Sequence, residues 1–321
     1  MAHIYIYSPS GAVRDKAAFA RGVKRLQALG HEVEVDAAAL DRWQRFAGDD
    51  ATRLAAISRA AASGADVALT TRGGYGLTRL LPALPYKALA RAAERGTRFV
   101  GFSDFTALQL ALLARAGGIT WAGPALLEGF GAASPAGPDE IMLACFDDVA
   151  CGSAEGTGWR LPAGDLAALA GRNLQRPLAR RALLWGGNLS MLASLLGTPW
   201  WPAQAAEEGG VLFLEDVGEH PYRVERLLAQ LLHAGALARQ KAILLGSFTG
   251  YTLTPHDRGY SLAKVVDWLR GQIKAPVLTR LPFGHTPTKV LLPVGARVDL
   301  LLEGREALVL WGHVLPHGGQ S

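Results

Sequence analysis

The chain has 321 residues, of which 50% are hydrophobic and 19% charged, with a net charge of +5 and two cysteines. This balance is typical of a folded globular protein and excludes a disordered chain or a disulfide-stapled one. The length favours two domains. The excess positive charge consists mostly of single arginines without a dense basic block, so we expect no nucleic-acid partner.

The first residues, "HIYIYS" at 3–8, alternate in the manner of a β-strand. They lack the basic and long apolar regions of a signal peptide. No run of about eighteen apolar residues occurs, so we expect no membrane span. We therefore expect a cytoplasmic protein.

Short apolar strands alternate with amphipathic helices through residue 125. This pattern predicts an α/β domain with a parallel sheet covered on both faces. Strands are expected at 3–8, 32–36, 66–71, 98–102 and 119–123, with helices at 13–30, 50–64 and 86–96.

Ligands of such sheets bind beyond the carboxyl ends of the strands. Four polar or glycine-containing stretches follow predicted strands and are expected to lie along one rim of the sheet. They are "SPSG" (8–11), "TRGGYG" (71–76), "FSD" (102–104) and "AGP" (122–124).

The pattern of apolar and polar residues changes after a predicted helix that ends near residue 152. Residues 153–180 mix glycine, proline and polar residues, and we interpret them as a crossover linker between an N-terminal domain (1–152) and a smaller C-terminal α/β domain (181–321). The C-terminal end is expected to form strands joined by turns, in an antiparallel or barrel-like piece. Strands are predicted at 211–217, 241–248 and 289–304, and helices at 188–197, 222–237 and 261–273.

Ser103 stands between a predicted strand and an amphipathic helix, in "GFSDFTAL" (101–108). One interpretation is a helix N-cap, with Asp104 favoured by the helix dipole in the first turn. The other is a nucleophile on a strand-to-helix turn, with backbone N–H groups beside it.

The glycine-rich stretch 71–76 is either a tight turn or a cradle for an anion or oxyanion. It matches neither the dinucleotide-binding motif nor a P-loop. Glu215 and Asp216 end an apolar strand, where adjacent residues point to opposite faces and only one can enter a site. No further ligands complete a metal site there, so we expect no metal.

His285 follows a predicted strand, where a lone histidine is either a surface residue or a catalytic base. A serine, a carboxylate and a histidine at the ends of separate strands are the set that acyl transfer requires, because imidazole accepts the serine proton and the carboxylate orients the imidazole.

Five blocks in register resemble the L,D-carboxypeptidase family, which also includes the microcin C immunity peptidases. They are "RGGYG" (72–76), "GFSDFTAL" (101–108), "GGNLSMLASLLGTP" (186–199), "LFLEDVGEHPYRVERLLAQL" (212–231) and "GHTPTKVLLPVG" (284–295). The resemblance implies that Ser103 is the nucleophile, Glu215 the orienting carboxylate and His285 the general base. It also implies an oxyanion hole formed by the N–H groups of Gly74 and Asp104.

The same resemblance implies an N-terminal domain like that of class I glutamine amidotransferases, a swivelling C-terminal domain, a homodimer, and no cofactor. The implied reaction is hydrolysis of the amide between L-lysine or meso-diaminopimelate and terminal D-alanine in murein tetrapeptides, in peptidoglycan recycling. Ala122 stands where many relatives have a histidine, which leaves substrate preference open.

Three further residues are candidates for substrate contact. Arg72 is expected to bind the free carboxylate of the substrate or to pair within the fold. Asn188 is expected to touch the substrate or to cap its helix, and Trp185 to wall the pocket or to pack in the core.

Two alternative functions remain open from the sequence. One is an immunity-type peptidase that cleaves aminoacyl-nucleotide conjugates, for which the tryptophans of "LLWGGN" and "TPWWP" would offer stacking surfaces for adenine. The other is an inactive binding protein with the same fold.

Overall fold

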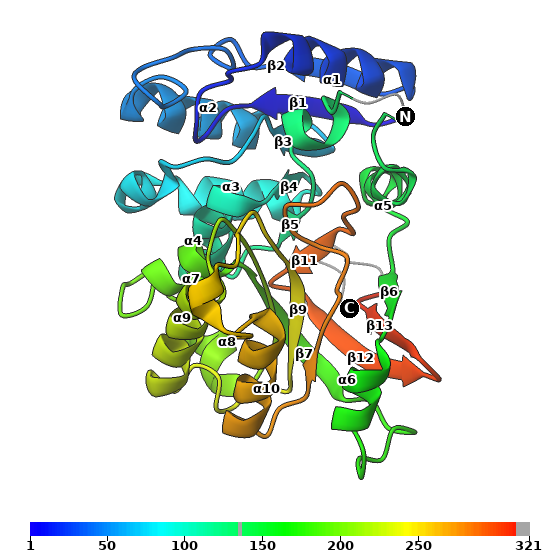
Figure 1. Ribbon diagram of the computed structural model, residues 1–321. Helices are drawn as coiled ribbons and strands as arrows, with labels where there is room; N and C mark the ends of the chain where they lie inside the picture. The colour runs from blue at the N-terminus through cyan, green and yellow to red at the C-terminus, as the bar shows by residue number, and fades with distance from the viewer. Residues whose placement is uncertain (134–136, 313–321) are drawn as a thin grey trace.

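The computed structural model describes residues 1–133 and 137–312. These residues form two sheets, with the first at the top and the second at the bottom of Figure 1. The first sheet has the order β11-β5-β4-β3-β1-β2, and all its neighbours are parallel except β11 and β5. Its strands are β1 (His3–Tyr7), β2 (Glu32–Val35), β3 (Val67–Thr70), β4 (Arg98–Gly101), β5 (Thr120–Ala122) and β11 (Leu292–Val294).

Helices cover both faces of this sheet, as the alternation along β1 requires. Ile4 and Ile6 pack in a cluster with α1 and α5, whereas Tyr5 and Tyr7 pack in the larger core with α2, α3 and α4. The helices are α1 (Lys16–Ala28), α2 (Asp50–Ala62), α3 (Tyr86–Glu94), α4 (Thr106–Ala116) and α5 (Glu140–Cys151), with the short turns η1 (Leu77–Arg79), η2 (Leu81–Ala83), η3 (Ser103–Phe105) and η4 (Leu126–Phe130).

The second sheet has the order β10-β9-β8-β7-β12-β13-β6. Its first four strands are parallel, and β12, β13 and β6 continue it in antiparallel pairs. The strands are β6 (Gly156–Arg160), β7 (Ala179–Asn188), β8 (Val211–Val217), β9 (Ala242–Thr249), β10 (Val277–Leu278), β12 (Arg297–Glu303) and β13 (Glu306–Leu310). The helices are α6 (Ala163–Ala168), α7 (Leu189–Ser194), α8 (Ala203–Glu208), α9 (Pro221–His233) and α10 (Leu262–Gln272), with the turn η5 (Pro255–Asp257).

The α/β class is therefore confirmed, and each of the five N-terminal strands lies where it was predicted. Local side chains set the helix ends. The carboxylates of Asp15, Asp49 and Asp139 accept hydrogen bonds from backbone N–H groups in the first turns of α1, α2 and α5. Gly117 and Gly152 end α4 and α5 in the left-handed conformation.

Three features differ from the sequence-based expectations. The expected linker, 153–180, contains β6 and α6, and β6 pairs with β13 at the edge of the second sheet. The strand β7 was not predicted, although it lies at the centre of that sheet. The strands expected at 289–304 were placed in one C-terminal piece, but β11 joins the first sheet and β12 joins the second. The division into domains stays a prediction.

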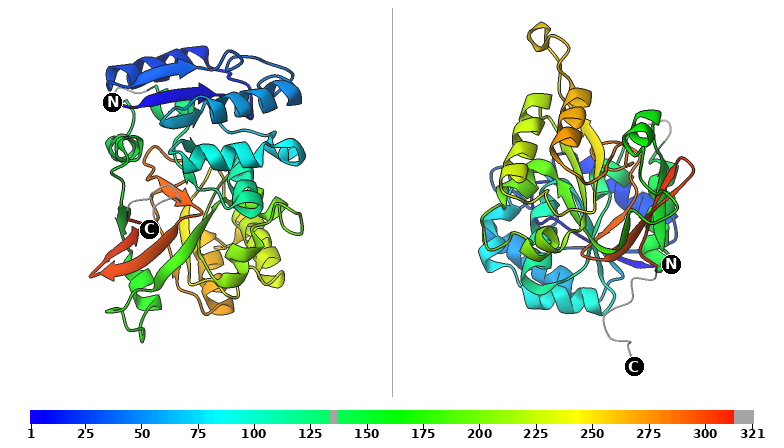
Figure 2. Two further views of the ribbon diagram at one scale, coloured as in Figure 1. Left: turned by 180° about the vertical axis from the view of Figure 1, so that it is seen from behind. Right: turned by 90° about the horizontal axis from the view of Figure 1, so that it is seen from below.

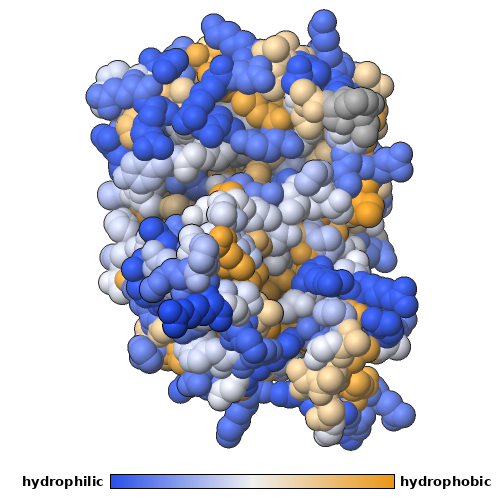
Figure 3. Space-filling view, viewed as in Figure 1, coloured by the Kyte–Doolittle hydropathy of each residue, from blue (hydrophilic) through white to orange (hydrophobic). Residues whose placement is uncertain are grey.

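The surface face in Figure 3 carries hydrophilic side chains over its upper part, with paler and apolar residues across the middle. Seen from below, the segment between β9 and α10 projects from the body of the protein (Figure 2). No helix within the described residues combines the length and the apolar character needed to cross a bilayer.

Candidate active site

The four stretches expected along one rim do meet at the carboxyl ends of β1, β3, β4 and β5. Gly11 donates its N–H to the carbonyl of Gly73 at 3.2 Å. The Ser8 and Thr71 hydroxyls are 2.7 Å apart, and Leu127, after β5, donates to the Thr71 carbonyl at 3.0 Å. The rim is therefore a continuous hydrogen-bonded surface above the parallel sheet, where such folds place their ligands.

Ser103 occupies a sharp turn between β4 and α4. Its φ of 62° lies in the left-handed region, which costs a non-glycine residue free energy and is concentrated at functional sites. The side chain does not cap the helix, because the N-cap of η3 is Phe102 and no side-chain capping bond forms there. Ser103 is half-buried, and its Oγ has no hydrogen-bond partner among the described residues. The N-cap interpretation is wrong, and the hydroxyl is left available for chemistry.

The glycine loop packs directly against this turn. A Cβ added to Gly73 would lie 2.8 Å from the Ser103 Cβ and 3.5 Å from the Asp104 nitrogen, so only glycine permits the approach. The next residue, Gly74, has a φ of 113°, and its N–H makes no hydrogen bond within the part of the chain that the structure describes. The Asp104 N–H belongs to the first turn of η3, whose amides lack intrahelical acceptors.

The side chain of Asp104 joins the glycine loop to the serine turn from below. Its Oδ2 accepts hydrogen bonds from the Ser10 hydroxyl and from the Leu77 N–H, the latter at 3.0 Å. The side chain is fully buried, and burial raises the pKa of its carboxyl group, against the opposing effect of these hydrogen bonds. Asp104 therefore holds together the two backbone segments that carry the candidate oxyanion amides.

Glu215 and His285 form a direct pair. The Nδ1 of His285 is 2.7 Å from Oε2 of Glu215, which is fully buried, whereas 20% of the His285 side chain is exposed. The His285 ring also packs on Phe102, the residue before Ser103, with 4.8 Å between ring centroids. A buried carboxylate thus orients an imidazole whose ring lies beside the serine turn, although no hydrogen bond joins His285 to Ser103 in the described structure.

Asn188 supports the carboxylate of this pair. Its Nδ2 donates to Oε1 of Glu215 at 3.2 Å and to Oδ1 of Asp216 at 2.9 Å. Its Oδ1 accepts from the Met191 N–H and from the Ser190 hydroxyl. All the hydrogen-bonding capacity of the amide is therefore used inside the protein. Of the two roles expected for Asn188, the structure shows the helix cap, and the substrate contact stays a prediction.

Asp216 does not simply point away from Glu215, as neighbours in a regular strand would. Both carboxylates accept from the same Asn188 Nδ2, and the pairing register of β8 shifts between Leu214 and Asp216. Asp216 also accepts hydrogen bonds from the N–H of Ser190 at 2.9 Å and from the Ser190 hydroxyl at 2.6 Å. Both carboxylates therefore have protein donors, and no group of three His, Cys, Asp or Glu side chains in the described residues is arranged to hold a metal ion.

The two sheets contribute jointly to this site. The N–H of Asn188, at the end of β7, donates to the Thr106 hydroxyl at the start of α4, at 3.1 Å. A Cβ on Gly187 would lie 2.5 Å from that hydroxyl oxygen, so the end of β7 touches the helix that follows Ser103. Ser103 comes from the first sheet and Glu215 from the second, and this contact fixes their relative positions.

Three further charged side chains, Arg72, Glu128 and Lys289, lie in this region. The Arg72 guanidinium packs over Gly11 and Gly74, and its Nε lies 3.9 Å from Oε1 of Glu128. Lys289, only 2% exposed, donates to the Thr286 carbonyl, and its Nζ lies 5.1 Å from the centre of the Phe102 ring. Burial lowers the pKa of the Lys289 ammonium, although Glu128, Glu215 and Asp139 favour its charged form.

Trp185 does not reach the site, contrary to its proposed role as a pocket wall. It is fully buried, its indole N–H donates to Oε1 of Gln240 at 3.0 Å, and its ring packs edge-on against Trp201 at 5.5 Å. The tryptophan fills the core beside β7, a central strand that lies between parallel β8 and antiparallel β12.

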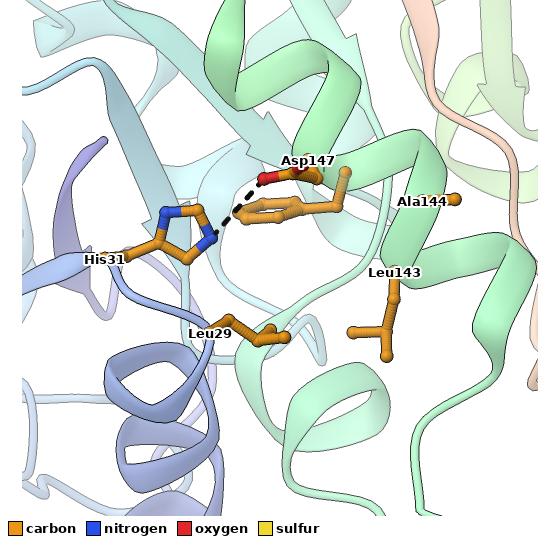
Figure 4. Close-up of a pocket in the computed structure, with 6 residues that line it drawn as sticks. Leu29, His31, Leu143, Ala144 and Asp147 are labelled. Carbon is orange, nitrogen blue, oxygen red and sulfur yellow. Dashed lines mark ion pairs between the residues drawn. The ribbon is translucent and has the colours of Figure 1, made fainter. Parts of the chain in front are cut away.

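A separate cavity of about 240 Å³ lies between α1 and α5 (Figure 4). His31 lines it, with its Nε2 3.9 Å from Oδ1 of Asp147. His31 directly precedes β2, so this cavity lies at the amino ends of the parallel strands, opposite the rim that carries Ser103.

Sequence reasoning missed Glu128 and Lys289 as members of this region. Glu128 and Lys289 are single charges within the apolar stretches "PALLEGF" and "TKVLLPVG", a signal that could have identified them. Ser10 lies in a predicted rim stretch, but its partner is 94 residues away.

Two family models match the chain. The LD-carboxypeptidase N-terminal domain matches residues 4–123, and the LD-carboxypeptidase C-terminal domain matches residues 181–300. A putative carboxypeptidase of Streptomyces coelicolor is 34% identical over 303 residues, covering 93% of this chain and 90% of that protein.

Relatives with more specific names are also similar. The murein tetrapeptide carboxypeptidase of Pseudomonas aeruginosa is 35% identical over 73% of this chain and 71% of its own length. The microcin C7 self-immunity protein of Escherichia coli is 27% identical over 72% of this chain and 70% of its own length. Among solved structures, the muramoyltetrapeptide carboxypeptidase from Oxalobacter formigenes has a TM-score of 0.82 and 36% identity, covering 97% of this chain and 98% of that one.

Proposed function

Because this chain belongs to the LD-carboxypeptidase family of peptidases, we propose that it is a serine-type carboxypeptidase of peptidoglycan recycling. Its substrates are murein tetrapeptides, from which it releases terminal D-alanine by cleaving the amide after L-lysine or meso-diaminopimelate. The observation that carries the proposal is the 2.7 Å pair of Glu215 and His285 beside the left-handed turn of Ser103.

The proposed reaction follows from the chemistry of these groups. The Ser103 Oγ attacks the peptide carbonyl carbon while Nε2 of His285 accepts the hydroxyl proton, and Glu215 on Nδ1 fixes the tautomer that makes this possible. The carbonyl π electrons move onto oxygen, and the N–H groups of Gly74 and Asp104 stabilise the oxyanion. His285 then donates its proton to the departing amine of D-alanine, leaving an acyl-serine. Water, activated by His285, hydrolyses this ester and regenerates Ser103.

Arg72 is proposed to bind the terminal carboxylate of the substrate. Its guanidinium lies on the glycine loop, next to the residues of the oxyanion hole, and 19% of its side chain is exposed. A carboxypeptidase must recognise a free carboxylate, for which guanidinium is the best-matched side chain. We also propose, from the family resemblance, a cytoplasmic homodimer; light scattering of the purified protein tests the oligomeric state.

The test is product analysis with L-Ala-γ-D-Glu-meso-diaminopimelate-D-Ala. Wild type is expected to release D-alanine, and the Ser103→Ala variant to release none while remaining folded by circular dichroism. A fluorophosphonate probe is expected to label wild type at Ser103.

Failure to release D-alanine by a folded, probe-reactive wild type would contradict the murein substrate. An aminoacyl-nucleotide conjugate is then the next substrate to assay, because of the similarity to the microcin C7 self-immunity protein. Trp185 and Trp201 pack on each other, so these two rings do not support the expectation that they stack on adenine. Failure in both assays would favour an inactive binding protein.

A further inference from the structure

Glu128 lies on a five-residue π-helical turn, η4, directly after β5. Such turns are rare and often occur at functional sites. The turn is held from both ends: Leu127 donates to the Thr71 carbonyl at 3.0 Å, and the guanidinium of Arg21 donates two hydrogen bonds to the Gly131 carbonyl. The backbone that carries Glu128 is therefore fixed relative to the rim of the site.

The carboxylate of Glu128 forms a long ion pair with Arg72 but accepts no hydrogen bond from it. Its nearest cation, Nε of Arg72, is 3.9 Å away, beyond hydrogen-bond distance, and 38% of the side-chain surface is exposed. Surrounding protein atoms desolvate the carboxylate and raise its pKa, whereas Arg72, His285 and Lys289 favour its charged form. His285 therefore contributes to the electrostatic environment of Glu128.

A cation that entered this region would find an open acceptor. The Glu128 carboxylate makes no hydrogen bond to another side chain among the residues that the structure describes. An ammonium beside it would gain charge-assisted hydrogen bonds on a turn that is already ordered. The adjacent Arg72 offers the opposite charge, so the two side chains suit a ligand that carries a carboxylate and an ammonium close together.

We propose that Glu128 binds the side-chain ammonium of the diamino acid that precedes the terminal D-alanine. This inference rests on the proposed function, in which Arg72 takes the D-alanine carboxylate and the preceding residue supplies the acyl group to Ser103. The ammonium belongs to the residue next to that carboxylate, and Glu128 is next to Arg72. Glu128 is thus a specificity-determining residue.

A requirement for a free side-chain ammonium constrains the order of reactions on the peptide. An amine that is acylated, as in a peptide cross-link, carries no charge and cannot pair with Glu128. The enzyme is therefore expected to prefer peptides whose side-chain amine is free. An amide-hydrolysing reaction that cuts cross-links must precede it.

Binding is measured by isothermal titration calorimetry on the Ser103→Ala protein, which binds without turnover. Three tetrapeptides are compared, with L-lysine, Nε-acetyl-L-lysine or norleucine at the third position. The lysine peptide is expected to bind about tenfold more tightly than the other two, and Glu128→Gln in the same background is expected to remove this preference. Glu94→Gln, an exposed glutamate at the end of α3, is the matched control and leaves the preference intact.

Equal binding of the three peptides, binding of none, or an equal loss for all three in Glu128→Gln would overturn the proposal. Glu128→Asp, which keeps the charge, is expected to keep part of the lysine preference, an effect that a purely structural role would not produce. Release of D-alanine by wild type is assayed in parallel. A preference for lysine without release refutes the carboxypeptidase function alone, whereas release without preference refutes the role of Glu128 alone.

Discussion

The carboxylate of Glu215 uses each of its oxygens for a different partner. Oε2 faces Nδ1 of His285 at 2.7 Å, and Oε1 accepts from the Asn188 amide at 3.2 Å. Asn188 therefore fixes which oxygen meets the imidazole. A neutral histidine carries one proton, and a carboxylate on Nδ1 keeps it there, which leaves Nε2 free to accept the serine proton.

Replacing Glu215 by glutamine should reverse this arrangement. The Asn188 amide would hold the glutamine carbonyl oxygen, so the new NH₂ group would face Nδ1 of His285 and force its proton onto Nε2. We expect kcat for D-alanine release to fall by roughly 10³-fold for Glu215→Gln and roughly 10⁴-fold or more for Ser103→Ala. The rates are measured under single-turnover conditions on proteins checked by circular dichroism.

Asp216→Asn is the matched control for the carboxylate. Asp216 contacts Asn188 and Ser190, not His285, so its loss should lower stability and leave kcat within about tenfold. The assignment of Glu215 would be wrong if Asp216→Asn abolished release while Glu215→Gln left it unchanged.

At the scale of elements, two backbone segments from different strands form one surface. The glycine loop follows β3 and the serine turn follows β4, and these strands are neighbours in the sheet. Gly73 lets the loop touch Ser103, and Asp104 ties both segments through Leu77. The proposed oxyanion hole thus depends on the close approach of two turns, each positioned by its own strand.

Gly73→Ala should disrupt that approach without unfolding the protein. The added methyl group would lie 2.8 Å from the Ser103 Cβ, so the loop or the serine turn must shift. Because the amides must meet the oxyanion at hydrogen-bond distance, we expect kcat to fall by roughly 100-fold. Steady-state kinetics and a thermal melt of the same preparation provide the measurement.

Gly117→Ala is the comparison. Gly117 ends α4 with a φ of 64°, and a Cβ there would contact nothing within 4 Å. Its replacement should cost about 1 kcal/mol of stability and leave kcat unchanged. A Gly73→Ala variant with full activity would show that the glycine loop does not bear on catalysis.

At the scale of the molecule, the two sheets share structural elements. α4 follows Ser103, has its first seven residues buried, and packs against α3 of one sheet and α7 and β7 of the other. The strand β11 returns from the C-terminal half of the chain to pair with β5. Its Pro293 has no N–H to donate, which suits an edge strand. The chain thus crosses between sheets more than once, and the crossing from β10 to β11 carries His285 and Lys289.

Stability of the whole protein should depend on pH through His31. Its side chain is 3% exposed, Nδ1 has no partner, and burial lowers its pKa more than Asp147 raises it. The unfolded state therefore binds the proton more readily. Stability should fall as pH drops below about 6.5, by at most about 1.4 kcal/mol per pH unit for this one group.

The measurement is urea unfolding of wild type and His31→Leu at pH 7.5 and pH 5. The difference in unfolding free energy between the two proteins should move in favour of the variant on acidification. Movement in favour of wild type would mean that pairing with Asp147 outweighs the burial of His31.

Much of the fold and part of the site could be predicted because the signals are local. Alternating apolar residues define β1, aspartates cap α1, α2 and α5, and Gly117 and Gly152 end two helices whatever lies far away. The polar stretches after successive strands indicate the rim, since parallel strands bring their carboxyl ends to one edge. The central strand β7 was not predicted, because its apolar centre is short and is flanked by arginines on one side and by glycines and an asparagine on the other.

The α/β class, the rim and the residue types available there follow from the amino-acid sequence alone. Which of these residues meet depends on the tertiary structure. In the folded protein, Glu215 pairs with a histidine 70 residues away and the Asn188 amide forms its hydrogen bonds within the protein. Trp185 is buried, and Glu128 lies beside Arg72. Such pairings depend on which strands become neighbours and on how side chains fill the space between layers. These are long-range choices, and local propensity does not encode them.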